Sequence, residues 1–116
     1  MTSWDEVSRL ATALSEVTEL EARGLRQWKV KGKLFVWERP LRKSDRDALG
    51  DAAPEGPIMA ARVEHEIAKQ ALLADDPHVF FTTPHFDGYP IVLVRLDRIS
   101  RSDLREVVTE AWLVRK

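Results

Sequence analysis

The stretch between residues 75 and 96, DDPHVFFTTPHFDGYPIVLVRL, constrains the fold more than any other part of the chain. Two runs rich in Val, Ile, Phe, Thr and Leu, residues 79–83 and 91–96, are typical of strands because these side chains fit a pleated surface. Between them, Pro84 and the pair Asp87-Gly88 supply turn geometry. The pattern predicts a β-hairpin that the remaining elements extend or pack against.

A second hairpin is predicted within residues 25–38, LRQWKVKGKLFVWE, with its turn at Lys31-Gly32. Glycine tolerates the positive φ that a two-residue hairpin loop requires. Apolar side chains fall on both faces of this hairpin, so the pattern leaves open which face belongs to the core. The turn sets a cross-strand register of Trp28 opposite Phe35, Val30 opposite Lys33, and Arg26 opposite Trp37.

Three stretches have the periodicity and the start signals of helices. Ser3 begins a capping box before a helix over residues 4–15, Ser100 caps the last helix, and a middle helix is predicted over residues 64–74. Each helix carries one apolar stripe that should face a sheet. The side chains expected to be buried are Leu10 and Leu14, then Ile67, Ala71 and Leu72, then Leu104, Val107, Val108, Ala111 and Val114.

The remaining segments complete the predicted topology. Residues 18–24 are interpreted as a polar bend, residues 44–49 as one helical turn, and residues 58–63 as a further strand, so the predicted order is α-β-β-β-α-β-β-α. Adjacent hairpins favour an antiparallel sheet, and the apolar stripes predict helices covering one of its faces, which is an α+β fold. A length of 116 residues suits a single domain over residues 1–116.

No segment of the sequence has the character of a membrane anchor or an export signal. There is no run of about eighteen apolar residues, so no transmembrane helix is predicted. The N-terminal segment MTSWDEVSRL is acidic and helix-like, without the basic start and the continuous apolar stretch of a signal peptide. We therefore expect a cytoplasmic protein without a membrane partner.

Residue types that carry catalysis or bind metals are sparse. The chain has no Cys, and its His65, His78 and His85 lack the spacing of a zinc site, which would need a further ligand from Asp87 or Glu66. No nucleophile elbow, Gly-rich phosphate loop or dinucleotide fingerprint occurs. We expect no enzymatic activity, no metal and no cofactor, and the weakest alternative is a hydrolase or isomerase that uses His85 with Asp87.

The net charge of −1 conceals an uneven distribution along the chain. Residues 1–22 sum to −4, residues 23–46 to +7, residues 47–78 to −5 and residues 79–116 to +1. Half of all Lys and Arg residues lie in the second of these stretches. This distribution predicts a basic face opposed by acidic helices and loops.

The basic stretch interleaves positive charge with aromatic side chains, a composition that can hold phosphates beside bases. A structural alternative exists, because basic residues on an edge hairpin also discourage aggregation. We expect Trp28 and Phe35 to be core residues rather than a stacking platform. For Phe86 and Tyr89, which flank Asp87-Gly88 at a loop tip, exposed contact surface and local packing both remain open.

Three segments, WKVKGKLFVW, LLADDPHVFFTTPHFDGYPIVLVRL and SDLREVVTEAW, contain a G-K-x-F turn, an L-x-x-D-P-x-x-F-F-x-T-P-H string and a V-R-L motif. Together with LSEVTE earlier in the chain, they resemble the MmcQ/YjbR-like family of small bacterial proteins. The resemblance implies a CyaY-like α+β fold and DNA binding through a double-wing arrangement of hairpins, without catalytic residues. The chain departs from the commoner pattern at Tyr89-Pro90 and in the acidic loop of residues 51–57.

On this resemblance we expect a DNA-binding protein with two hairpin wings and a supporting basic patch. The main alternative is a protein-interaction or small-ligand-binding module, in which the basic patch is incidental. The expected phosphate contacts are Arg23, Lys29, Lys31, Lys33, Arg39, Arg42 and Lys43, and the expected tip of the second wing consists of His85, Phe86 and Tyr89.

Overall fold

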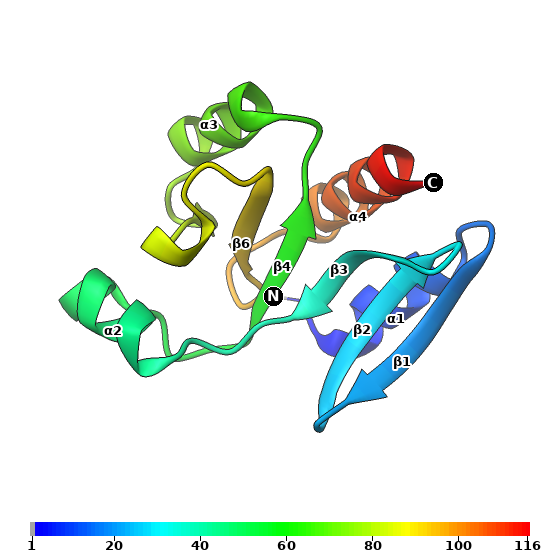
Figure 1. Cartoon of the computed structure of the whole chain (residues 1–116), viewed down its shortest axis with the longest axis horizontal. Helices are drawn as coiled ribbons and strands as arrows, with labels where there is room; N and C mark the ends of the chain where they lie inside the picture. Colours follow the sequence, from blue (N-terminus) through cyan, green and yellow to red (C-terminus); the bar gives the residue numbers. More distant parts are fainter. Residues whose placement is uncertain (1) are drawn as a thin grey trace.

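A six-stranded antiparallel sheet with four α-helices forms the framework of the computed structural model, which describes residues 2–116 (Figure 1). The strand order across the sheet is β1-β2-β3-β4-β6-β5. This architecture confirms the predicted α+β class. The helices are α1 (Trp4–Thr12), α2 (Lys43–Leu49), α3 (Glu66–Asp75) and α4 (Arg101–Arg115), the strands are β1 (Val17–Ala22), β2 (Leu25–Val30), β3 (Lys33–Glu38), β4 (Ile58–Arg62), β5 (Phe80–Phe81) and β6 (Ile91–Arg95), and two 3-10 turns are η1 (Gly50–Ala52) and η2 (Pro84–Phe86).

Side-chain caps fix where three of the helices begin. The Ser3 hydroxyl accepts a hydrogen bond from the Glu6 N–H (3.3 Å), and the Ser100 hydroxyl accepts one from the Asp103 N–H (3.1 Å). Each bond satisfies a backbone donor that has no partner inside its helix. The predicted starts of α1 and α4 are confirmed. The sequence did not indicate that His65 caps α3, where its Nδ1 accepts from the Ala68 N–H (3.1 Å).

Residues 17–22 form an edge strand, so the prediction of a polar bend there was wrong. β1 pairs with β2 along its whole length, from Val17 opposite Val30 to Ala22 opposite Leu25. Backbone pairing stabilises this strand although most of its side chains are exposed. The missed signal is the pair Arg23-Gly24, whose φ angles of 54° and 79° match those of the predicted Lys31-Gly32 turn, at 51° and 80°.

The predicted register between β2 and β3 is correct only next to the turn. Val30 lies opposite Lys33, but a β-bulge shifts the pairing so that Trp28 lies opposite Val36 instead of Phe35, and Gln27 rather than Arg26 lies opposite Trp37. A bulge places two residues of one strand against one of its partner, which period-two alternation cannot reveal. Trp28 and Phe35 are nevertheless fully buried, as expected for core residues.

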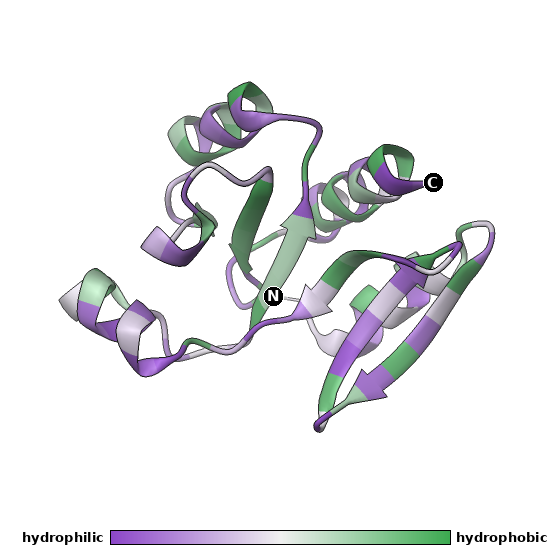
Figure 2. Cartoon of the chain, viewed as in Figure 1, coloured by the Kyte–Doolittle hydropathy of each residue, from purple (hydrophilic) through white to green (hydrophobic). Residues whose placement is uncertain are grey.

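Two clusters of buried side chains occupy the two faces of the sheet. Helices α1 and α4 pack on one face over the larger cluster, and the opposite face carries a smaller one, to which α2 contributes Leu49 and η2 contributes Phe86. Figure 2 shows β4 and β6 as largely hydrophobic, whereas β1 and β2 alternate. Successive residues of the central strands divide between the faces: Met59, Ala61, Val92 and Val94 join the larger cluster, and Ile58, Ala60, Ile91 and Leu93 join the smaller.

Helix α3 turns a different side to the core from the predicted one. Ile67 is 78% exposed and Ala71 is also exposed, whereas Lys69 is only 1% exposed and Leu72 is partly buried. The Lys69 ammonium donates hydrogen bonds to backbone carbonyls, as described below, and this interaction sets the rotation of the helix. In α4, by contrast, Leu104, Val107, Val108 and Ala111 are buried as predicted, and of the side chains predicted to be buried only Val114 is exposed.

Long-range hydrogen bonds hold both ends of the described chain in place. The Thr2 hydroxyl donates a hydrogen bond to the Leu96 carbonyl (2.7 Å), and the Trp112 indole N–H donates one to the Ser15 carbonyl (3.0 Å). Among residues 2–116, no helix is long and apolar enough to cross a membrane.

Candidate nucleic-acid interface

The basic residues of the stretch 23–46 separate in space instead of forming one patch. Arg23 lies in the β1–β2 turn and Lys31 in the β2–β3 turn, at opposite ends of a six-residue strand, about 20 Å apart at 3.3 Å per residue. Helix α2, which begins at Lys43 with Arg42 as its N-cap, lies on the opposite side of the molecule from the β2–β3 turn along its 38 Å longest axis (Figure 1). The prediction of a single basic face is therefore not met.

The tip of the β2–β3 hairpin presents few unpaired cations. Lys31 is exposed, but its ammonium lies 3.4 Å from the Glu16 carboxylate. The backbone N–H of Lys31 also donates a hydrogen bond to the backbone carbonyl of Glu16 (3.3 Å). Lys33 is exposed at the start of β3. Lys29 is the last residue but one of β2, opposite Thr18, on the sheet face turned away from α1. These lysines do not share a surface with α2.

Arg39 is buried, so the prediction that it contacts phosphate was wrong. Its side chain is only 7% exposed, and its Nη2 lies 3.1 Å from the Asp45 carboxylate. The guanidinium also donates to the Pro40 carbonyl and lies 5.2 Å from the centre of the Phe86 ring. Arg39 thus joins the end of β3, helix α2 and the segment 84–90 from inside the protein.

Asp45 is the buried counter-charge of Arg39 and also caps α2. Its carboxylate accepts a hydrogen bond from the Arg42 N–H (2.9 Å). Burial alone would raise the pKa of Asp45, but this backbone hydrogen bond and the charge of Arg39 together outweigh it, so the pKa lies below its usual value. The ionised carboxylate therefore holds the first turn of α2 in place.

The segment 84–90 folds back over the sheet, so the prediction of Phe86 as an exposed contact at the tip of the second wing was wrong. Phe86 is only 5% exposed within the smaller cluster, and its ring makes an edge contact with His85 at 4.8 Å. The Lys69 ammonium donates to the carbonyls of Phe86 (2.7 Å) and Tyr89 (3.1 Å). These bonds tie the segment to α3, while the side chains of His85 and Tyr89 remain exposed.

The strongest cationic surface of this region lies on α2. Arg42, Lys43 and Arg46 are exposed, and within residues 2–116 no carboxylate lies within 4.0 Å of any of them. Arg46 lies within the helix, and Arg42, four positions earlier, is its N-cap residue. Because η2 contacts α2, we group its exposed residue His85 with these cations. We call these four residues the α2 surface; Arg46 was not among the expected contacts, although its i+4 spacing from Arg42 is visible in the sequence.

The three imidazoles of the chain serve separate parts of the structure. His65 caps α3, His78 precedes β5, and His85 lies in η2. Within the part of the chain that the structure describes, His, Asp and Glu side chains form no group of three or more that could hold a metal ion.

Comparisons with known proteins agree with this fold. The sequence profile of the YjbR family matches residues 12–114. The "Uncharacterized protein Rv2570" of Mycobacterium tuberculosis and the "Uncharacterized protein Mb2600" of Mycobacterium bovis are each 52% identical over 117 residues, covering 98% of this chain and 88% of theirs. The crystal structure of Deinococcus radiodurans protein DR2400, a DUF419 domain, aligns with a TM-score of 0.73 over 98% of this chain and 78% of that one. At 16% identity, this last similarity demonstrates a common fold alone.

Proposed function

The chain belongs to the YjbR family, and from this premise we propose that it binds double-stranded DNA through the phosphate contacts of the α2 surface. The observation that carries the proposal is a set of three exposed cations, two on one short helix and one at its N-cap, none of them paired with a carboxylate among residues 2–116. Phosphate contacts supply most of the affinity of sequence-independent DNA binding.

The buried residues behind α2 support this role. The Arg39–Asp45 ion pair and the Arg42 N–H bond fix the first turn of the helix, so the cations project from a rigid base. Rigid placement lowers the conformational entropy that is lost when side chains are ordered on binding. Asp45 directly precedes Arg46 in the sequence, and because Arg39 neutralises it inside the protein, it does not cancel the surface charge.

The proposal assigns phosphate contacts to Arg42, Lys43 and Arg46, with His85 at the border of the contact area. Contacts of this kind position a protein on a duplex without reading its sequence. Arg23, Lys29, Lys31 and Lys33, which the sequence also suggested, lie away from α2 and serve as the comparison in the test below. Arg39 and Phe86 are excluded as contacts because both are buried.

Titration of a labelled duplex at several salt concentrations tests the proposal. Each phosphate contact changes the slope of log K against log salt by about −0.9, so three contacts predict a slope of roughly −3. The double variant Arg42→Gln with Arg46→Gln should flatten the slope by about two units. The matched variant Lys31→Gln with Lys33→Gln removes the same charge from the hairpin tip and should leave the slope unchanged.

Either of two results would overturn the proposal. Undetectable duplex binding at low salt would remove the DNA role altogether. A slope that responds to the hairpin variant but not to the α2 variant would move the interface to the β2–β3 turn. Both variants change exposed side chains, so unaltered melting temperatures should accompany either result.

A further inference from the structure

The two edges of the sheet differ in how far they are open to a further strand. At one edge, β5 has only two residues, and the N–H of Phe80 donates a hydrogen bond to the Asp76 carbonyl (2.9 Å) in the turn before the strand. At the other edge lies β1, whose six residues extend over about 20 Å at 3.3 Å per residue. Figure 1 shows β1 as the outermost strand beside β2. Residues 18–22 are all exposed, so this edge is accessible along most of its length.

Every second residue of β1 directs its backbone N–H and C=O away from β2. In a two-residue hairpin the residues on either side of the turn form a hydrogen-bonded pair, here Ala22 with Leu25. The alternation of an antiparallel ladder extends this pattern to Glu16, whose carbonyl accepts the Lys31 N–H (3.3 Å). The residues with outward backbone groups are therefore Val17, Glu19 and Glu21. Among residues 2–116, no backbone group outside these two strands bonds to them.

The features that block a free edge in many proteins are missing from β1. The strand contains no Pro and no Lys, and its pairing with β2 is unbroken, whereas the β-bulge lies between β2 and β3. Its charged side chains are Glu19 and Glu21. The Glu19 carboxylate accepts hydrogen bonds from the Trp28 indole N–H (2.7 Å) and from the Ser8 hydroxyl of α1, so both glutamates lie on the face toward α1. On the other face Leu20 is 40% exposed.

The two glutamates oppose the pairing of β1 with a second copy of the chain. Two β1 strands related by a two-fold axis run antiparallel, and residues opposite each other lie on the same face. The two registers that pair most of the strand place Glu19 of one copy opposite Glu19 or Glu21 of the other. Like charges directly opposite each other destabilise a strand pair, whereas opposite charges stabilise it. Neither glutamate forms an ion pair among residues 2–116.

We propose that the β1 edge binds an extended segment of a partner protein as an additional antiparallel strand. The segment carries Lys or Arg at alternate positions, with apolar or β-branched side chains between them. Its main chain bonds to the outward groups of β1, its basic side chains pair with Glu19 and Glu21, and an apolar side chain lies beside Leu20. The β1 edge is separate from the α2 surface, so this inference does not depend on the proposed DNA role.

The peptide Thr-Lys-Val-Lys-Val-Thr, with fluorescein at its N-terminus and an amide at its C-terminus, is the probe. In the antiparallel arrangement its two Lys residues lie opposite Glu21 and Glu19. Binding to the full chain is measured by fluorescence anisotropy at low salt. The Glu21→Gln variant should weaken binding about threefold, since an exposed ion pair stabilises a complex modestly. The peptide Thr-Glu-Val-Glu-Val-Thr should not bind.

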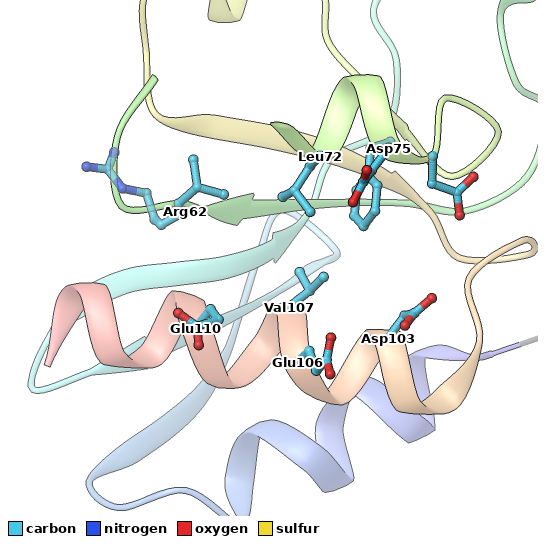
Figure 3. A pocket seen from close by; sticks show the side chains of 10 residues that line it. Arg62, Leu72, Asp75, Asp103, Glu106, Val107 and Glu110 are labelled. Atoms are coloured by element: carbon cyan, nitrogen blue, oxygen red, sulfur yellow. The ribbon is translucent and has the colours of Figure 1, made fainter. Parts of the chain in front are cut away.

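The matched control removes one charge from another acidic surface. Figure 3 shows Asp103, Glu106 and Glu110 of α4 beside a groove between α3 and α4, with Asp75 of α3 on its other side. Glu110→Gln should leave the affinity for the peptide unchanged. A loss of affinity in this variant, with none in Glu21→Gln, would overturn the proposal because the peptide would then bind at the groove.

Methylation of single backbone nitrogens in the probe separates strand addition from simple attraction of a cationic peptide. The N–H of each Lys in the bound peptide faces β1, because it lies opposite a residue with outward groups, whereas the N–H of each Val faces solvent. N-methylation of the second Lys should weaken binding about tenfold, since it removes a hydrogen bond and places a methyl group against the edge. N-methylation of the first Val should leave the affinity nearly unchanged.

Three results would each overturn the proposal. The first is no binding of the parent peptide at low salt, and the second is an equal effect of the two methylations. The third is a dimer of the free chain that the peptide dissociates, which would identify a second copy as the occupant of the β1 edge.

Discussion

Asp45 fixes the orientation of α2 through a single buried carboxylate. The carboxylate of Asp45 accepts a hydrogen bond from the Arg42 backbone N–H and faces the Arg39 guanidinium. Both partners favour the ionised form of Asp45. A buried ion pair is not in itself a large source of stability, because desolvation offsets the attraction between the charges. Removing one partner is costly nonetheless, since it leaves the other charge buried alone.

The Asp45→Asn variant tests this arrangement, because it keeps the shape and the acceptor oxygen but removes the charge. We expect a loss of about 3 kcal/mol in the free energy of unfolding at pH 7. The pKa of Asp45 is lowered in the folded state, so its charge stabilises the fold above the ordinary value of 3.8, and this stabilisation disappears as the pH falls through the folded pKa. The difference in the free energy of unfolding between parent and variant, measured by urea denaturation from pH 7 down to pH 3, should therefore become smaller as the pH falls.

A matched change on the same helix provides the control for this prediction. Asp47 is exposed, and Asp47→Asn should alter stability by no more than about 0.5 kcal/mol. A gap between parent and Asp45→Asn that stays constant across this pH range would show that the carboxylate is not the origin of the effect.

At the scale of single residues, the sequence distinguishes apolar core residues well and buried charges poorly. Trp28, Phe35, Leu104 and Val108 are buried as the patterns predict. Arg39 and Lys69 are buried only because their partners, Asp45 and the carbonyls of the segment 84–90, come from other parts of the chain. No local pattern records such a partnership, so a cation in sequence is assigned to the surface by default.

At the scale of elements, α4 is the helix on which the larger core cluster depends. Its four buried residues all belong to this cluster, and Val108 is fully buried among them. Val108→Asp should prevent folding, because an unpaired buried carboxylate costs several kcal/mol, comparable with the total stability of a domain of this size. Thermal melts followed by circular dichroism would check this, and a cooperative transition close to that of the parent would contradict the packing of α4 described above.

The elements that the sequence predicts correctly are those with strong periodicity or capping signals. The helices α1 and α4, the strands β4 and β6, and the Lys31-Gly32 turn are all of this kind. β1 was missed because backbone pairing with β2 stabilises it although it has no apolar stripe. The segment 84–90 has the composition of an exposed turn, yet Phe86 inserts into the smaller cluster, since a single aromatic side chain outweighs the polarity of its neighbours.

At the scale of the whole molecule, reversal of the chain at each hairpin explains why the cations of residues 23–46 do not form one surface. Cations that are close in sequence are placed at opposite ends of β2 or carried beyond β3 to α2, so a sum of +7 over residues 23–46 does not produce one surface. The carboxylates around the groove between α3 and α4 show the reverse relation between sequence and structure. Asp75 and Asp103 are far apart in sequence and meet only because α3 and α4 pack on either side of the groove, so charge counting along the chain could not locate it.

The two glycine-containing turns on either side of β2 also bear on the order in which the chain folds. They make β1, β2 and β3 a meander whose contacts are local, whereas the bonds that hold the chain ends, such as Thr2 to Leu96, span 94 positions. Closing a short loop loses less entropy than closing a long one. In pulsed hydrogen exchange during refolding, the amides of the meander should gain protection before those of Leu96 and α4. Simultaneous protection of both regions would show that the molecule assembles in one concerted step, with no early intermediate built on the meander.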